Sequence, residues 1–173
     1  RRYHVRQAVL AEPVEAQPLW DELVRLLGEQ GTSVHVARER DRLILDGAQS
    51  QKEVVIEVLS VAEGWLTLEL ITGTGRVLLL QSLADEPLPP AVGRGPVAAV
   101  VYPWRRTTHD PALEALAPEV IVFGERPGRD PQLTLAERRV GSAKLLHEAL
   151  DGRIDLQFDL TGMNIAVTRQ RGN

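Results

Sequence analysis

The sequence contains no cysteine, and this absence excludes several kinds of chemistry at once. Disulfide bonds, thiolate metal ligands and a cysteine nucleophile are all ruled out. Aromatic residues make up only 4% of the chain, so valine and leucine must form most of the core. No apolar run approaches the length that a membrane-spanning helix needs, and no signal peptide is visible.

Positive charge is scarce as well. The formal net charge is −4, and only Lys52 and Lys144 are lysines, so arginine carries nearly all the positive charge. This balance argues against a dedicated nucleic-acid-binding protein, although local arginine clusters can still bind phosphate. The length predicts a single domain over residues 1–173. Because the chain begins at Arg1 without a methionine, we interpret it as a fragment of a longer protein.

The stretch 97–106 organises the rest of the chain. Residues 97–101 are all small or β-branched and apolar, with glycine and proline before them and Pro103 after them. Such a run predicts a strand that is buried on both faces of a sheet. This strand would place Trp104, Arg105 and Arg106 at the carboxyl end of a central sheet, where α/β proteins hold their chemistry.

Apolar alternation and apolar runs predict further strands at 5–10, 34–36, 43–45, 54–59, 66–71, 76–80, 120–123, 154–158 and 165–167. Helices are expected from Pro18 to a cap at Gly31, over 110–116, and over 135–150 as an amphipathic helix ended by Gly152. The glycines of the hairpin turn 72–75 are expected to supply positive φ. Together these elements predict a mixed α/β sheet with helices outside it.

Neither metal binding nor nucleophilic catalysis has a clear signature. The four histidines, His4, His35, His109 and His147, share no ligand spacing, and His147 is expected on the late helix. No serine lies in a nucleophile-elbow context, and the 72–75 turn lacks the helix of a phosphate loop. The sequence therefore predicts no catalytic and no metal-ligating residue.

Four arginines follow two of the buried strands. Arg105 and Arg106 follow the first strand, and Arg126 and Arg129 follow the second. They could form a rim that binds phosphate or DNA at one sheet edge, or they could simply be solvated loop charges. Trp104 is expected to pack against the end of the sheet rather than stack on a base.

Several short motifs follow one another in the order of a known family. They are Arg2-Tyr3-His4-Val5, Leu-Trp-Asp-Glu-Leu at 19–23, Asp-Arg-Leu at 41–43, Arg-Val-Leu-Leu at 76–79, Pro103, Ala-Leu-Ala-Pro-Glu-Val at 115–120 and Pro131. This order resembles the C-terminal metallo-β-lactamase-like domain of ComEC-type competence proteins, the membrane channels for DNA uptake. The resemblance covers nearly the whole chain. It implies an α/β fold, the second half of an αββα sandwich with a mixed β-sheet and outer helices.

The metal-binding positions of that family are replaced. Its Gly-Asp is here Gln81-Ser82, its His-His is Trp104-Arg105, and the histidine of its Gly-His-Pro is Asp130 or Arg129. The family would imply zinc or manganese, but serine, tryptophan and arginine at these positions neither hold an ion nor lower the pKa of its bound water. A fixed arginine charge also opposes a cation. We therefore expect no metal and no small-molecule cofactor.

The resemblance implies a soluble domain of a bacterial cell-membrane protein, with a non-catalytic role that is either structural or DNA-contacting. The expected partners are DNA, the membrane-channel portion of the parent chain, and a second copy bound through an uncovered sheet face. Two alternatives stay open. One is a metal-dependent nuclease or phosphodiesterase whose remaining ligands precede Arg1, and the other is an unrelated α/β binding module.

Overall fold

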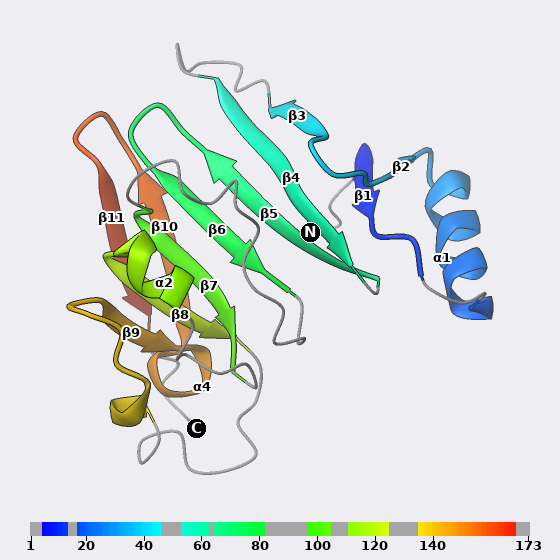
Figure 1. The fold of residues 1–173 in the computed structure, drawn as a ribbon. Coiled ribbons are helices and arrows are strands. Elements are labelled where there is room, and N and C mark those ends of the chain that lie inside the picture. The colour runs from blue at the N-terminus through cyan, green and yellow to red at the C-terminus, as the bar shows by residue number, and fades with distance from the viewer. Residues whose placement is uncertain are drawn as a thin grey trace.

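A seven-stranded sheet forms the centre of the computed structural model (Figure 1). The structure describes residues 5–13, 17–45, 53–62, 64–81, 97–104, 111–124 and 135–168. In spatial order the strands are β3 (Arg42–Leu45), β4 (Val54–Ala62), β5 (Trp65–Ile71), β6 (Arg76–Leu80), β7 (Ala99–Pro103), β8 (Val120–Gly124) and β9 (Lys144–His147).

One half of this sheet is antiparallel and the other half is parallel. Strands β3 to β6 are antiparallel neighbours, and β6 to β9 are parallel neighbours. The predicted mixed sheet is thus confirmed. Parallel strands end at the same side of a sheet, so β6, β7, β8 and β9 all end along one border, which we call the carboxyl edge.

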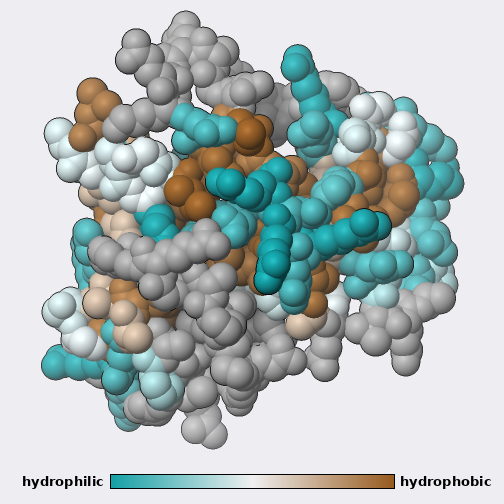
Figure 2. All heavy atoms as spheres, turned by 45° about the horizontal axis from the view of Figure 1, so that its top comes forward, coloured by the Kyte–Doolittle hydropathy of each residue, from teal (hydrophilic) through white to brown (hydrophobic). Residues whose placement is uncertain are grey.

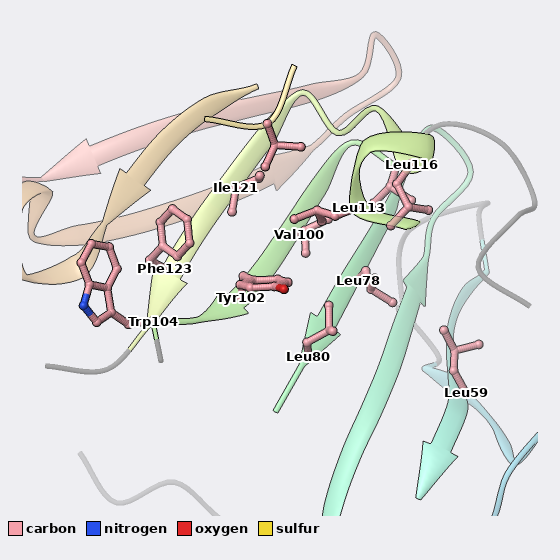
Figure 3. Close-up of a cluster of buried hydrophobic side chains, with 12 residues drawn as sticks. Leu59, Leu78, Leu80, Val100, Tyr102, Trp104, Leu113, Leu116, Ile121 and Phe123 are labelled. Carbon is pink, nitrogen blue, oxygen red and sulfur yellow. The ribbon is translucent and has the colours of Figure 1, made fainter. Parts of the chain in front are cut away.

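The parallel strands are buried on both faces, as their continuous apolar runs predict. In β6, Leu78 and Leu80 belong to the core on one face, and Val77 belongs to a separate core on the other. On the first face, Leu113 and Leu116 of helix α2 (Pro111–Leu116) cover the sheet (Figure 3). The strand predicted at 97–101 exists, but it spans Ala99–Pro103.

The opposite face of the parallel half is also covered. A closing hairpin of β10 (Arg153–Phe158) and β11 (Met163–Thr168), expected from the sequence, packs its apolar side chains on this face. The predicted uncovered sheet face is therefore wrong for the parallel half of the sheet. The physical reason is that the chain supplies both covers itself, α2 on one side and the hairpin on the other.

The N-terminal residues form a separate small layer. Strands β1 (Gln7–Leu10) and β2 (Ser33–Val36) pair in parallel, joined by helix α1 (Pro18–Glu29). Val9 packs with Val58 and Leu66 of the large sheet. Val58 shares a face with the side that β10 and β11 cover, because cross-strand partners lie on the same face.

The parallel half of the large sheet thus lies between α2 and the β10–β11 hairpin, whereas the antiparallel half carries β1–β2, with α1 packed on β2. The second β-layer consists of two separate pieces, β1–β2 and β10–β11, which are distinct sheets. Figure 1 shows α1 at the periphery of the molecule, and its main contacts are with β2. Figure 2, which brings the top of Figure 1 forward, shows hydrophobic residues lying in patches between hydrophilic ones. Within the described residues, no helix is long and apolar enough to cross a membrane.

The end of α1 has the geometry predicted for Gly31. This glycine has φ of 75°, its N–H donates to the carbonyl of Gly28, and the N–H of Thr32 donates to the carbonyl of Leu27. The two bonds satisfy carbonyls that the helix itself leaves open. A glycine is needed here because the left-handed conformation strains other residues.

The predicted amphipathic helix over 135–150 is wrong. The chain instead forms a short 3-10 turn η2 (Ala136–Arg138), strand β9 and a single helical turn α4 (Glu148–Asp151). Gly141, with φ of 52°, breaks the helical path, and β9 pairs with the free edge of β8. Tertiary pairing therefore overrides the helical spacing of the apolar residues, and only the stop at Gly152 is confirmed, with φ of 81°.

The turn 72–75 joins β5 and β6 as predicted, but for a different reason. Gly75 is not among the described glycines with positive φ. A Cβ at this position would lie 2.7 Å from Cε1 of Phe158. A side chain at residue 75 would therefore force the Phe158 ring of β10 to shift, so the glycine is favoured by this contact and not by its own backbone conformation.

Candidate functional site

Trp104 lies at the carboxyl edge, directly after β7, and is 7% exposed. Its ring is perpendicular to that of Phe123, with 5.3 Å between centroids, and to that of His147, at 4.6 Å. Figure 3 shows Trp104 beside Phe123, with Tyr102 further along the same side of the sheet. These edge-to-face contacts make Trp104 part of the core, which confirms its predicted packing role.

Arg138, from the turn η2, closes this cluster. Its guanidinium carbon lies 4.1 Å from the centroid of Trp104 and 5.5 Å from that of Phe123. A guanidinium over an aromatic face is attracted by the partial negative charge that the quadrupole of the neutral ring places on its face. Burial lowers the pKa of Arg138 from its ordinary value, while Tyr102 acts in the opposite sense. A fixed cation therefore lies against the carboxyl edge.

His147 is the last residue of β9 and is completely buried. Its Nδ1 accepts a hydrogen bond from the N–H of Ala149 at 3.0 Å, and its own backbone N–H donates to Oδ2 of Asp151 at 2.9 Å. Both bonds cap the start of α4. The predicted placement on a helix is wrong, because β9 displaces that helix. The run His-Glu-Ala-Leu-Asp-Gly is the cap signal that sequence reasoning missed.

The surroundings of His147 keep its imidazole neutral. Burial lowers the pKa of His147, and the carboxylates of Glu148 and Asp151 oppose this effect, while Arg138 adds to it. Because Nδ1 accepts a hydrogen bond, the neutral ring carries its proton on Nε2. That Nε2 is buried and has no hydrogen-bond partner among the described residues. Protonation would place a second positive charge beside Arg138 and remove the acceptor at Nδ1.

The first prediction concerns acid. Folding lowers the pKa of His147, so the unfolded chain binds a proton more readily than the folded chain. The free energy of unfolding therefore decreases as the pH falls below about 6.5, the ordinary pKa of histidine. The contribution is fully present above that pH. Urea midpoints measured between about pH 8 and 5 should fall toward acid in the unsubstituted chain. The slope should be smaller in His147→Asn, which keeps an acceptor near the Nδ1 position.

Lys144→Asn is the matched control, because it introduces the same residue at an exposed position of the same strand, β9. It should leave the pH slope of the unsubstituted chain nearly unchanged. Equal slopes for His147→Asn and the unsubstituted chain would contradict the role given to His147.

The side chains described at the carboxyl edge do not fit a catalytic metal centre. They are an indole, a guanidinium, and an imidazole whose Nδ1 is already engaged. Gln81, directly after β6, is exposed and is the wrong residue type for a bridging carboxylate. Among the described residues, no group of three or more histidines and carboxylates could hold a metal ion. The other predicted positions, Ser82, Arg105, Arg106, Arg126, Arg129 and Asp130, lie outside the described residues.

A second polar feature crosses the antiparallel half of the sheet. Glu57 of β4 and Glu69 of β5 are direct cross-strand partners, and both are buried. Arg76 donates from Nε to Oε1 of Glu69 at 2.6 Å, and Nε of Arg42 lies 3.8 Å from Oε2 of Glu57. Two guanidinium groups thus flank two carboxylates, which is a charge-balanced structural row. Sequence reasoning missed it, because the partners come from four different strands.

A cleft of about 400 Å³ lies between the small sheet β1–β2 and strand β3. Its lining residues are Gln7, Val9, Ser33, His35, Asp41, Arg42, Leu43 and Ile44. Nε2 of His35 lies 2.7 Å from Oδ2 of Asp41, and the N–H of Arg38 donates to the same oxygen. These two contacts, His35 first, lower the pKa of Asp41. The contact between His35 and Asp41 links β2 to the turn before β3.

No family model matches this chain, and no curated protein matches it. Among solved structures, it is similar to the metallo-β-lactamase fold protein YhfI from Bacillus subtilis, with a TM-score of 0.52 and 8% identity, over 82% of this chain and 62% of YhfI. It is also similar to a proposed metal-dependent hydrolase from Parabacteroides distasonis, with a TM-score of 0.48 and 11% identity, over 82% of this chain and 76% of that chain.

The likeness to YhfI defines the class of fold. This chain has an α/β fold with a mixed seven-stranded sheet and few helices, structurally like that of metallo-β-lactamase fold proteins. The expected fold class is confirmed to that extent. At 8% identity the likeness concerns the fold alone, and the activity must be argued from the residues at the site.

Proposed function

We propose that this chain is a non-catalytic metallo-β-lactamase-like domain that serves a DNA-uptake protein as a structural or DNA-contacting part. The observation that supports it most is the filled carboxyl edge, where Arg138 stacks on Trp104. In the family that the sequence resembles, the position of Trp104 belongs to a histidine pair. An edge packed with an aromatic ring and a guanidinium is suited to holding the fold together.

The electrostatics at this edge also favour a non-hydrolytic role. Metal-assisted hydrolysis needs ligands that hold the ion and an open position for water. The guanidinium of Arg138 would repel a divalent cation beside Trp104. Nδ1 of His147 already accepts a hydrogen bond, and the whole side chain is buried. The nuclease alternative therefore has no support among the described residues.

The DNA-contacting part of the proposal rests on arginines that follow strands of the carboxyl edge in the sequence. Arg105 and Arg106 come directly after Trp104, and Arg126 and Arg129 come soon after β8. Guanidinium groups bind phosphate in a bidentate manner, which suits a nucleic-acid backbone. The overall charge of −4 confines such binding to a local patch.

The second prediction tests DNA contact. Fluorescence anisotropy with a labelled single-stranded oligonucleotide should show weak binding that declines as salt rises. The double variant Arg105→Glu/Arg106→Glu should weaken this binding about tenfold at low salt, since two phosphate contacts become repulsive. Lys144→Glu/Arg153→Glu, at exposed positions on β9 and β10, changes the net charge by the same amount, so it is the matched control and should bind nearly as the unsubstituted chain does.

Unchanged binding after the double reversal would return Arg105 and Arg106 to the role of solvated loop charges. Cleavage of the oligonucleotide with manganese or zinc, abolished by EDTA, would contradict the non-catalytic proposal itself. The two measurements use the same protein and separate the DNA-contacting part of the proposal from its non-catalytic part.

A further inference from the structure

The cleft between the small sheet β1–β2 and strand β3 has walls of two different kinds. On β1 and β2 the lining residues alternate along each strand, Gln7 with Val9 and Ser33 with His35. Alternate residues share one face of a strand, so this wall is a face of the small sheet. At β3 the lining residues are consecutive, over 41–44. Consecutive side chains point to opposite faces, so this wall is the edge of β3 itself.

The edge of β3 has free backbone groups. Among the described residues, β3 is the last strand of the large sheet and pairs only with β4 (Figure 1). The N–H of Val58 donates to the carbonyl of Asp41, and this pair continues the register of the β3–β4 ladder. Hydrogen-bonded pairs alternate with non-bonded pairs along an antiparallel ladder. The alternation therefore turns the N–H and C=O groups of Arg42 and Ile44 away from β4.

The side chains of β3 do little to protect this edge. Proteins commonly protect an edge strand with several charges, a proline or a bulge. β3 carries one charge, at Arg42, and otherwise presents apolar side chains, of which Ile44 and Leu45 are 59% and 44% exposed. A free edge beside a cleft is suited to binding an extended peptide as an added strand, because the main chain supplies the hydrogen bonds and the side chains select the sequence. The volume of about 400 Å³ leaves room for a short segment.

The charges of the cleft favour an acidic residue in such a peptide. The side chain of Arg42 is 62% exposed, and its Nε lies 3.8 Å from Oε2 of Glu57, which is too long for a hydrogen bond. The carboxylate of Asp41 is already engaged within the chain, by the N–H of Arg38 and by Nε2 of His35. The exposed charge that the cleft offers to a partner is therefore the guanidinium of Arg42, which attracts a carboxylate.

We propose that the cleft binds an extended peptide segment of a partner protein, which pairs with the free edge of β3 and adds a strand to the large sheet. Side chains of neighbouring strands that lie opposite each other share a face. The peptide residue beside Arg42 is acidic, and the residues beside Leu43 and Ile44 are apolar or β-branched. The residue beside Leu43 also meets Val9 on the small sheet, since both line the cleft. This site lies at the opposite end of the strand order from β9 and is independent of the role proposed for the carboxyl edge.

The third prediction uses the end-blocked peptide Glu-Val-Thr-Val-Glu, which reads the same in both directions. Its titration into isotope-labelled protein, followed by NMR, should shift the amide signals of Arg42 and Ile44 and saturate at about 1 mM peptide or below. The control peptide Lys-Val-Thr-Val-Lys should bind at least about tenfold more weakly, because its lysines face Arg42. Methylation of the threonine amide and methylation of the two valine amides should differ in effect by about tenfold or more, because only alternate N–H groups of an added strand face β3.

Variants of the protein test the same contacts from the other side. Ile44→Pro removes an N–H that faces away from β4 and should abolish binding, whereas Ile44→Ala keeps that N–H and should bind within about threefold of the unsubstituted chain. Arg42→Ala should bind the glutamate and lysine peptides about equally, and circular dichroism shows whether each variant is folded.

Three results would overturn the proposal. The first is the absence of saturable shifts at Arg42 and Ile44, and the second is equal binding of the two peptides by the unsubstituted chain. The third is a dimer in sedimentation velocity that Ile44→Pro dissociates, which would assign the edge of β3 to a second copy. If Ile44→Pro does not fold, Arg42→Ala and the methylated peptides still decide the question.

Discussion

Replacing Trp104 with alanine should lower the free energy of unfolding by about 3–5 kcal/mol, the range for truncating a large buried aromatic side chain. The loss has two sources. The cavity removes the edge-to-face contacts with Phe123 and His147, and it leaves the guanidinium of Arg138 without the ring beneath it. Urea unfolding followed by circular dichroism measures the change directly.

Trp65→Ala is the matched control, because it removes the same side chain from a position that is 41% exposed. Its effect should be below about 1 kcal/mol, in the range of a surface substitution. Trp104→Phe should lose less than Trp104→Ala, since a smaller ring remains for Arg138 to stack on. If Trp104→Ala and Trp65→Ala destabilise equally, the carboxyl edge is not the packed cluster described above.

Replacing Glu69 with leucine should lower the free energy of unfolding by about 3–5 kcal/mol, the cost of removing one member of a buried ion pair. Glu69 is only 1% exposed and accepts from Arg76, whose side chain is itself largely buried. Without the carboxylate, the guanidinium keeps its charge in a site of low polarity. Urea unfolding again gives the measurement.

The double variant Glu69→Leu/Arg76→Leu distinguishes this cause from simple loss of packing. An apolar pair of similar volume often replaces a buried ion pair at little cost, so the double variant should lose less than the sum of the two single variants by more than about 1 kcal/mol. Arg42→Ala is the control, because Arg42 is largely exposed and 3.8 Å from Glu57. It should change stability by less than about 1 kcal/mol. Strict additivity of Glu69→Leu and Arg76→Leu would contradict the prediction.

Sequence patterns predicted most of the strands, because an apolar run between turn residues and strict alternation each favour one kind of strand. The apolar runs of β6, β7 and β8 can only be buried on both faces, and alternation in β10 and β11 implies one covered face. The packing role of Trp104 followed from its position after such a strand. The cap at Gly31 followed from the preference of glycine for positive φ.

The patterns failed where the same spacing of apolar residues is compatible with both a helix and a strand. The apolar residues of 135–150 are compatible with a helix, yet Lys144–His147 pairs with β8, and that pairing wins because it extends a buried sheet. His147 therefore lies at the buried end of a strand and not on the predicted helix, and its Nδ1 caps α4. The local signals, Gly141 and the cap that His147 forms, show where a long helix is interrupted but not that Lys144–His147 pairs with β8.

The sequence by itself determined the strands other than β9, the mixed α/β class and the position of Trp104 at the carboxyl edge, because residue type and periodicity suffice for each. Only the tertiary structure decided which side chains meet there. Arg138 reaches Trp104 from a turn more than thirty residues later, and Glu69 meets Arg76 across neighbouring strands. Such contacts depend on strand order and on which elements cover each face, and these follow from the packing of the whole chain. The exposure of Leu19, Leu23 and Leu26 on α1 is likewise a tertiary property, since an amphipathic pattern shows where apolar residues lie on a helix but not what covers them.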